Sequence, residues 1–568
     1  MGESAEFLNL TGCSSFDDFS NRLREYDLKY PDKAWIVGFG WEQDKLSADA
    51  RYPSRHDLDA VIRGRPVMLH RACWHIAVVN TKALEIAGVD AAQTTPHTVA
   101  SGTIDVDERG ATGILREAAV GLVTKHTNET SDAIRLKYLR YALEKCVSQG
   151  LTGIHTNDDD AWQLYSQIQR DSGLPLRVYL TPLINELKAN PSIPKAGSRD
   201  GLLSCDRIKI FGDGSLGAET AALRQPYRDT TNTGILMDTN EALVQKVADA
   251  HAAGYRLEIH AIGDRAAEQV LMALQEAGVP PEKRPIITHC QILGDDLLTK
   301  MKDQGVIGNI QPSFTITDAS FARKRLPESM IPYSYCWKSM IERGIVCAGG
   351  SDSPIETCNP FQGIYDAIYR CKPTSPEDVY LPSECLSFEQ ALEIYTKNGA
   401  FAAMEEHRLG QLAPGFAADF VVLAKDVTQD HAALLDADLV RSVWVNGTKT
   451  THQSSGTMSF GGDTSGTAPR VNKKTLGAYV SRTVALVGSV ESHTPTAVVL
   501  RTSDGGMVNI NPMPGSDFSS KYVEVIGRVL DGETLQEFKT TLFGENFDLE
   551  TYDQFVQLAQ GKFRPLFD

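Results

Sequence analysis

Four side chains in the middle of the sequence are of the types that bind divalent metal ions. His260, His289 and Asp352 stand at or near the ends of short apolar runs, and Lys209 lies within an earlier run. Neutral imidazole and carboxylate groups suit zinc, and a lysine can join them when carbon dioxide converts its amine to a carbamate. Each histidine alone would more often be structural. Their joint placement at corresponding run ends, with Gln311 ending a further run, favours a metal site.

The runs that would position these residues alternate with charged, helix-like stretches. Runs rich in Ile, Val and Leu are typical of parallel strands buried on both faces, and a β/α alternation makes a closed barrel or a doubly wound sheet. In β/α barrels the active site lies at the C-terminal ends of the strands. Seven runs are one fewer than a closed barrel needs. They are residues 151–156, 176–182, 207–214, 257–264, 286–291, 306–312 and 345–352.

Two neighbouring features have a structural as well as a functional interpretation. His155 ends the first run beside NDDD, and it suits a hydrogen-bonded barrel residue as well as it suits a ligand. The stretch DGSLG (213–217) could be a plain turn. Because it follows Lys209 so closely, we expect a loop over the mouth of the barrel.

Composition indicates a soluble globular protein of more than one domain. The chain has 568 residues, of which 42% are hydrophobic and 23% charged, and a net charge of −17 that does not suit a phosphate-backbone binder. All ten cysteines lie between Cys13 and Cys385 without a C-x-x-C pair, which suits free thiols in a reducing compartment. No signal peptide or membrane-spanning run is visible. We therefore expect an intracellular protein with no membrane partner.

The composition changes twice in the second half of the chain. Residues 387–404 have the pattern of an amphipathic helix, and 409–426 and 439–450 resemble strands with Gly turns. Residues 449–468 are almost wholly Ser, Thr and Gly, as in a flexible linker. Five short strand-like segments and a helix over 547–560 follow, which is the content of a small OB-type barrel. The strand-like segments are 483–490, 496–504, 508–513, 522–530 and 535–543.

Many stretches of the first 450 residues match one set of family motifs in order. They are WIVGFGWE (35–42), PVMLHRACWHIAVVNTKAL (66–84), ERGATGILREAA (108–119), KIFGDGSLGAETA (209–221), IHAIGDRA (259–266), THCQIL (288–293), NIQPSF (309–314), AGGSDSPIE (348–356) and LGQLAPGFAADFVVL (409–423). Together they resemble amidohydrolase family 3, which includes YtcJ-like and N-substituted formamide deformylase-like proteins. The resemblance implies a TIM-like (β/α)8 barrel with an insertion at 35–120 and an accessory β-sandwich.

The resemblance also implies roles for the metal-type residues. Lys209, His260 and His289 match ligands on barrel strands four to six, and Lys209 is carbamylated in many relatives. Asp352 matches the strand-eight aspartate, which binds or faces the metal and moves the proton. The implied protein is a hydrolase of non-peptide amide or N-acyl bonds, using one or two divalent ions, with zinc expected.

Three further residues would line the substrate pocket of such an enzyme. His75 and Glu117 fall within the family's insertion, and Gln311 follows the sixth run. The expected partner of the pocket is a small-molecule amide.

The sequence departs from the family at one motif. The family's first barrel strand ends in His-x-His, which supplies two more metal ligands, and this chain contains no such triplet. We therefore expect a barrel without its first strand and with only part of its β-sandwich. Loss of two ligands should impair metal binding, and an open barrel exposes two sheet edges. Either the sequence starts late or the hydrolase is a catalytic relic.

The last hundred residues resemble a second family, the small subunit of replication protein A (replication factor A protein 3). The matching stretches are 469–490, 522–529 and 543–567. The resemblance implies an OB fold that acts mainly as a scaffold. Its C-terminal helix would join the two larger subunits, so that single-stranded DNA is reached indirectly.

The final helix has an apolar stripe that suits a partner helix, although part of it could pack on its own barrel. From Arg470 onward there are 10 basic and 12 acidic residues, so direct DNA contact through Lys473, Lys474 or Arg482 is the weaker alternative. The stripe consists of Leu549, Tyr552, Phe555, Val556 and Ala559, and the first four are the predicted partner residues.

These patterns leave three interpretations of the whole chain. It is an amidohydrolase with an OB module attached, a replication and repair subunit joined to a neighbouring gene's product by a gene-model error, or a true fusion whose barrel no longer catalyses. The hydrolase would be cytoplasmic, and assembly with replication protein A would place the chain in the nucleus. The predicted parts are the barrel (1–408), the partial β-sandwich (409–450), the linker (451–468) and the OB fold (469–568).

Overall fold

Seven parallel strands, one of them divided into the segments β11 (Leu203–Cys205) and β12 (Arg207–Phe211), follow one another through the first part of the computed structural model. The series starts with β8 (Gly153–Thr156) and β9 (Arg177–Leu180). Next comes β11, which pairs with β9 and leads straight into β12. The later strands pair in chain order, and they are β13 (Arg256–Ala261), β14 (Ile286–His289), β15 (Ile307–Ile310) and β16 (Cys347–Gly349). All seven predicted runs are therefore confirmed as strands.

The structure describes residues 1–46, 51–95, 97–99, 102–127, 131–189, 193–450, 470–480, 482–494, 497–513 and 516–560. The predicted linker, 451–468, lies outside them. The chain divides into two units, Met1–Gln453 and Ser454–Asp568. In the described part, no helix is both long enough and apolar enough to cross a membrane.

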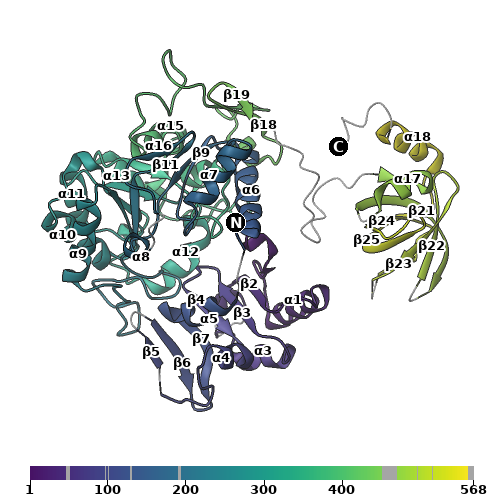
Figure 1. The fold of residues 1–568 in the computed structure, drawn as a ribbon, viewed down its shortest axis with the longest axis horizontal. Coiled ribbons are helices and arrows are strands. Elements are labelled where there is room, and N and C mark those ends of the chain that lie inside the picture. The colour runs from purple at the N-terminus through teal and green to yellow at the C-terminus, as the bar shows by residue number, and fades with distance from the viewer. Residues whose placement is uncertain are drawn as a thin grey trace. The chain divides into compact units, whose positions relative to one another are not determined.

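Helices connect successive strands and cover their outer side (Figure 1). The helix α9 (Asn240–Ala252) starts at Thr239, whose side chain accepts a hydrogen bond from the Ala242 amide. Every residue of β12 except Phe211 is buried, and so is all of β13, as expected for a sheet covered on both faces. The other helices of this region include α6 (Asp132–Ser148), α7 (Trp162–Asp171), α10 (Asp264–Glu276), α11 (Asp295–Asp303), α12 (Phe314–Arg325), α13 (Trp337–Glu342), α14 (Pro360–Tyr369), α15 (Phe388–Tyr395) and α16 (Lys397–Ala402).

A second, mixed sheet is built from the start of the chain, drawn in purple in Figure 1. Its strand order is β1-β2-β3-β4-β7-β6-β5, and the first three strands are parallel. The predicted insertion, 35–120, falls within this sheet, which also includes β1 (Leu8–Asn9). Its helices are α1 (Phe16–Lys29), α3 (Arg55–Val61) and α4 (Thr81–Ile86). Its remaining strands are β2 (Ile36–Trp41), β3 (Val67–Arg71), β4 (Ile76–Val79), β5 (His97–Val99), β6 (Gly102–Asp107) and β7 (Gly110–Glu117).

A small antiparallel sheet ends the first unit. It consists of β17 (Phe420–Leu423), β18 (Val440–Val445) and β19 (Thr448–Thr450). The predicted strand over 409–426 is shorter than expected, because Gly410 and Gly415 take positive φ angles and turn the chain before Phe420.

The second unit contains a closed β-barrel. Its strands are β21 (Thr483–Thr494), β22 (Ala497–Thr502), β23 (Met507–Asn511), β24 (Tyr522–Val529) and β25 (Thr534–Gly544). They follow the order β21-β22-β23-β25-β24, and β24 returns to pair with β21. The closing helix is α18 (Leu549–Gln560). The five predicted strands and the predicted helix are all present, and the arrangement is that of a small OB-type barrel.

Candidate active site

Buried ion pairs link charged side chains of the neighbouring strands β12 and β13. Lys209 and Glu258 are register partners on β12 and β13, so their side chains point the same way. The Lys209 Nζ atom lies 3.5 Å from Glu258 Oε1 and donates to the Thr288 hydroxyl at 3.2 Å. Arg207 donates to the other Glu258 oxygen at 3.1 Å. Burial works against ionisation of Glu258, but the two cations hold its pKa below the usual value.

His260 and His289 lie side by side at the C-terminal ends of β13 and β14. Their ring centroids are 4.5 Å apart, and both side chains are buried. The Nε2 atom of His260 lies 3.0 Å from the Gly214 carbonyl oxygen and 3.2 Å from Asp213 Oδ1. Because a carbonyl oxygen only accepts, Nε2 carries a proton and donates a hydrogen bond to Gly214, so the protein anchors the ring through this nitrogen.

The other imidazole is anchored through its opposite nitrogen. His289 Nδ1 lies 2.9 Å from Gln311 Oε1, while the Gln311 amide donates to the backbone and side chain of Asn309, each at 3.2 Å. This leaves Nε2 of His289 with its lone pair. Burial, with the nearby His260 and Lys209, lowers the pKa of His289 well below its usual value, so the ring is neutral. Gln311 was predicted to line the substrate pocket, and in the structure it positions His289.

The predicted pocket residues His75 and Glu117 reach this site from the mixed sheet. His75 Nδ1 lies 2.7 Å from Glu117 Oε2, and the His75 ring centroid is 5.6 Å from that of His260. Burial disfavours a charged ring, but the Glu117 carboxylate raises the pKa of His75 to about 9. Glu117 takes a φ of +52°, a strained conformation for a non-glycine residue. The structure therefore places a charged His75 ring beside His260 and His289.

Asp352 stands three residues beyond the end of β16, in a turn with a φ of +54°. Its side chain keeps access to solvent, yet the surrounding protein raises the pKa of the carboxyl by desolvation, which Lys209 and His260 partly oppose.

His155, by contrast, stacks on Tyr179 and lies 2.8 Å from an Arg207 guanidinium nitrogen. Burial lowers the pKa of His155 well below its usual value, and its contacts are those of a structural residue among the parallel strands.

The donor chemistry of His260 and His289 fits a divalent ion, because each ring has one nitrogen anchored by the protein and one left over. Within the described ranges, no three His, Cys, Asp or Glu side chains stand close enough together to hold a metal ion. The pair is therefore an incomplete ligand set as placed.

Two residues of the site were missed in the sequence. Asp213 is fully buried, and its carboxylate accepts hydrogen bonds from the amides of Ala222, Ile262 and Gly263 while facing His260. The second is Glu258, whose carboxylate balances the positive charge of the buried Lys209. Glu258 precedes His260 by two positions on a predicted strand, so the period-two pattern of strands could have identified it.

The final helix packs against its own barrel through two of the four predicted partner residues. Val556 is fully buried and Tyr552 is 9% exposed, and both contact Val487 of β21. Leu549 packs beside them, partly buried. The side chain of Phe555 lies outside the described residues. Tyr552 and Val556 therefore fix α18 to the barrel, and the face that they form is not free for a partner.

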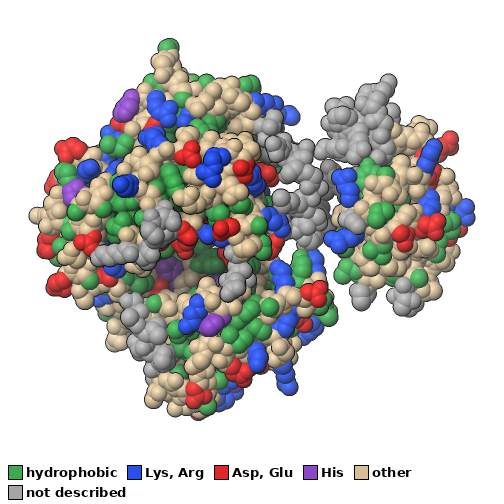
Figure 2. All heavy atoms as spheres, viewed as in Figure 1, with side chains coloured by type: hydrophobic (Ala, Val, Ile, Leu, Met, Phe, Trp, Pro, Cys, Tyr) green, Lys and Arg blue, Asp and Glu red, His purple; other side chains and the backbone are tan. Residues whose placement is uncertain are grey.

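The surface of this unit has mixed charge. On the face shown in Figure 2, acidic and basic side chains are interspersed over residues 470–560. Arg470 and Arg501 are paired with Glu524 and Glu491. This distribution does not favour a groove that tracks a phosphate backbone on that face.

Comparison with known proteins identifies two families. Residues 2–450 match the amidohydrolase family, and residues 463–567 match replication factor A protein 3. The chain is 30% identical to the amidohydrolase YtcJ of Bacillus subtilis over 457 residues, covering 78% of this chain and 85% of that protein. It is 32% identical over 105 residues to the replication protein A 14 kDa subunit of Oryza sativa subsp. japonica, covering 18% of this chain and 98% of that protein.

A solved structure gives the same result for the first unit. A metal-dependent hydrolase from Pyrococcus horikoshii matches with a TM-score of 0.60 and 28% identity, over 75% of this chain and 83% of that chain. The chain therefore belongs to the amidohydrolase family through its first unit and has a replication factor A protein 3 domain at its C-terminus.

Proposed function

We propose that the first unit is a divalent-metal-dependent hydrolase of carbon–nitrogen bonds in amides or N-acyl compounds other than peptides. The pair of imidazoles, His260 and His289, supports this more than any other observation. Their ring centroids lie 4.5 Å apart, and each ring has one anchored and one spare nitrogen. Membership of the amidohydrolase family and likeness to a metal-dependent hydrolase support the same proposal.

The spare nitrogens of His260 and His289 would hold the ion, for which we propose zinc, with Lys209 and Asp352 as the remaining ligands. A bound divalent ion polarises a carbonyl oxygen and lowers the pKa of water. Lys209 donates to Thr288 and pairs with Glu258, contacts that favour the ammonium over the carbamate. A carbamate at Lys209 would require Glu258 to move or take up a proton.

The other residues of the site have separate roles in this proposal. The charged His75 donates a hydrogen bond to the substrate's carbonyl oxygen, and Glu117 keeps that ring charged. Asp352 transfers a proton to the leaving nitrogen. Gln311 positions the His289 ring.

We further propose that the seven parallel strands are a TIM-like (β/α)8 barrel without its first strand. The strand order supports this, since β8 and β16 are the two ends of an otherwise continuous parallel series in the described residues. With no His-x-His in the sequence, two ligands of the family's site are missing, and we expect the given chain to bind metal weakly and to be impaired as a catalyst.

Metal content of the purified 568-residue chain, measured after loading with zinc, tests the proposal. We expect zinc to be bound by the wild type and lost in His260→Ala and His289→Ala, while the exposed His407→Ala control retains it. Hydrolysis of N-acyl compounds, measured after zinc loading, should be lost in the same two variants. No bound metal in the wild type, or equal binding by all four proteins, would overturn it.

For the second unit we propose assembly with the larger subunits of replication protein A in the nucleus, with single-stranded DNA contacted indirectly. The match over 98% of the rice 14 kDa subunit supports this. The docked position of Tyr552 and Val556 implies that a partner would contact another face of α18. Co-purification of the larger subunits with the full chain tests it, and their absence would contradict it.

One observation favours a second function, a replication and repair subunit joined to a non-catalytic barrel. No third His, Cys, Asp or Glu donor joins His260 and His289 in the described part of the chain. Transcript sequences across residues 449–468 would separate a true fusion from a joining of two gene products. If no single message spans that segment, the fusion is excluded.

A further inference from the structure

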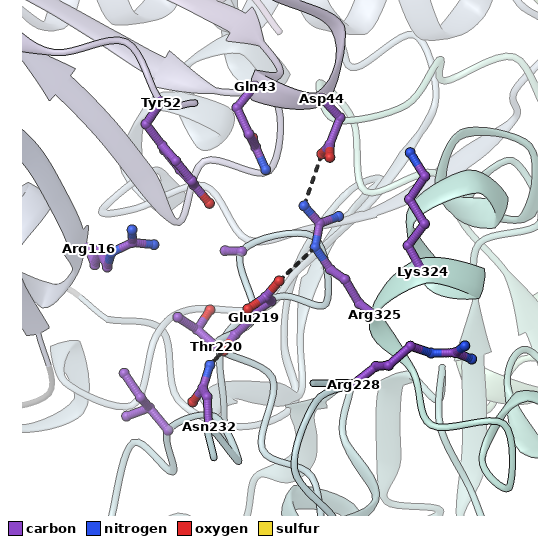
Figure 3. Close-up of a pocket in the computed structure, with 12 residues that line it drawn as sticks. Gln43, Asp44, Tyr52, Arg116, Glu219, Thr220, Arg228, Asn232, Lys324 and Arg325 are labelled. Atoms are coloured by element: carbon purple, nitrogen blue, oxygen red, sulfur yellow. Dashed lines mark hydrogen bonds and ion pairs between the residues drawn. The ribbon is translucent and has the colours of Figure 1, made fainter. Parts of the chain in front are cut away.

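A cavity of about 600 Å³ lies between the mixed sheet and the loop that follows β12 (Figure 3). Figure 3 shows Arg116 on one side of this cavity and Lys324, Arg325 and Arg228 on the other. Uncharged polar groups, including the side chains of Tyr52 and Asn232, also line it. Its volume is that of a small-molecule site.

The cavity adjoins the His75–Glu117 pair through two shared segments. Arg116 directly precedes Glu117 at the end of β7. Thr220 lines the cavity and also lies close enough to Glu117 that its hydroxyl helps to lower the pKa of the Glu117 carboxyl. Thr220 belongs to the same loop as Gly214, the residue that anchors His260. A ligand that reaches His75 with one end can therefore place its other end in the cavity.

The two acidic residues of the lining both pair with the same arginine. Arg325 pairs with Asp44 at 2.9 Å and with Glu219 at 3.0 Å, as the dashed lines in Figure 3 show. Arg116 is paired with Asp105 at 2.8 Å, outside the lining. The acidic groups of the cavity are thus already satisfied by protein contacts.

Positive charge remains after these pairings. Lys324 is exposed and has no acidic partner among the described residues. Arg228 donates to the Leu326 carbonyl and lies 3.7 Å from Glu328. Because the Glu328 side chain is 87% exposed, its ion pair with Arg228 is weak and offsets little of the Arg228 charge. The Nη1 atom of Arg325 is shielded from solvent, with no hydrogen-bond partner in the described part of the chain. Unsatisfied buried donors favour an acceptor ligand.

We propose that this cavity is a subsite for an anionic oxygen group, a carboxylate or a phosphate, on the distal end of the substrate. Guanidinium and ammonium groups that converge on one space recognise such oxyanions. This inference rests on the proposed hydrolase function and narrows its substrates to N-acyl or amide compounds that carry a negatively charged group in addition to the scissile amide. Lys324 and Arg228 are the specificity-determining residues.

Binding to the full chain tests the subsite without requiring catalysis. By calorimetry, we expect the wild type to bind N-acetylglycine more tightly than the uncharged N-acetylglycinamide. Lys324→Gln and Arg228→Gln should each weaken N-acetylglycine binding about fivefold to tenfold and leave N-acetylglycinamide binding unchanged. Lys300→Gln, on the exposed face of α11, is the matched control. Displacement by inorganic phosphate would show that the subsite takes any oxyanion, and no displacement would assign it to carboxylates.

The outcomes separate this inference from the proposed function. A preference for N-acetylglycine that disappears in the variants, without hydrolysis by the zinc-loaded protein, supports the subsite and contradicts the hydrolase. Hydrolysis of both compounds with equal affinity overturns the subsite and leaves the hydrolase standing. Failure of the wild type to bind N-acetylglycine, or equal binding by wild type and variants, also overturns the subsite.

Discussion

The Nδ1 atom of His289 lies 2.9 Å from the Oε1 atom of Gln311, and Gln311 is itself fixed by Asn309. This chain of contacts determines which nitrogen of the imidazole carries its proton, and it directs the other nitrogen away from Gln311. A ligand histidine oriented in this way binds metal with less reorganisation than a free ring.

Substitution of Gln311 by leucine should therefore weaken metal binding while leaving both histidines in place. Removing such an anchor typically lowers metal affinity about 10-fold to 100-fold. Competition with a chromophoric zinc chelator measures the change. Gln245→Leu, on the exposed surface of α9, is the matched control. Equal affinities of the two variants would show that Gln311 does not position the ring.

Substitution of Glu258 by glutamine should destabilise the first unit. Glu258 is 4% exposed and compensates both Lys209 and Arg207, so its loss leaves buried cations unpaired. We expect the free energy of unfolding to fall by about 3–5 kcal/mol. All six tryptophans precede residue 453, so tryptophan fluorescence in urea reports this unit alone. The exposed Glu241→Gln is the control, and a loss below about 1 kcal/mol would contradict a structural role for these ion pairs.

Asp318 should make stability depend on pH. Burial raises the pKa of this carboxyl to about 7, although the Tyr335 hydroxyl donates to it at 2.8 Å. The folded state thus favours the protonated acid, whose stabilising effect is complete at low pH and is lost as the pH rises towards 7. Relative to Asp318→Asn, the wild-type free energy of unfolding should fall by up to about 4 kcal/mol between pH 4 and 7 and then level off.

Urea unfolding of the two proteins across this pH range measures the difference, with the exposed Asp303→Asn as the control. A wild-type stability that runs parallel to that of Asp318→Asn would contradict the raised pKa. A wild-type free energy of unfolding that rises with pH relative to that of Asp318→Asn would contradict its sign.

Truncation of Val556 should loosen α18 from the barrel of the second unit. Val556 is fully buried against Val487, and replacing it with alanine removes two buried methyl groups, at a cost of about 2 kcal/mol. Hydrogen exchange of peptides from β21, measured on the full chain, should become faster. The exposed Gln554→Ala is expected to leave exchange unchanged. Equal protection in the two variants would show that α18 docks by other contacts.

The sequence alone determined the strands and the types of the site residues. Runs that are apolar on both faces specify buried parallel strands locally, so all seven of these strands could be predicted. The same holds for the five strands and final helix of the second unit. The residues at strand ends follow directly, since parallel strands bring their C-terminal ends to one edge.

Only the tertiary structure decided how these residues meet. The pairing of Lys209 with Glu258 depends on the register between β12 and β13, which no local pattern encodes. His75 and Glu117 lie more than a hundred residues from His260, and the packing of the mixed sheet brings them beside it. Likewise, the apolar stripe of α18 could be predicted from the sequence, but only the tertiary structure shows that this stripe packs against the β-barrel of the same unit. Side-chain contacts between distant segments depend on how the helices and sheets pack against one another. The local sequence pattern of a single segment does not specify that packing.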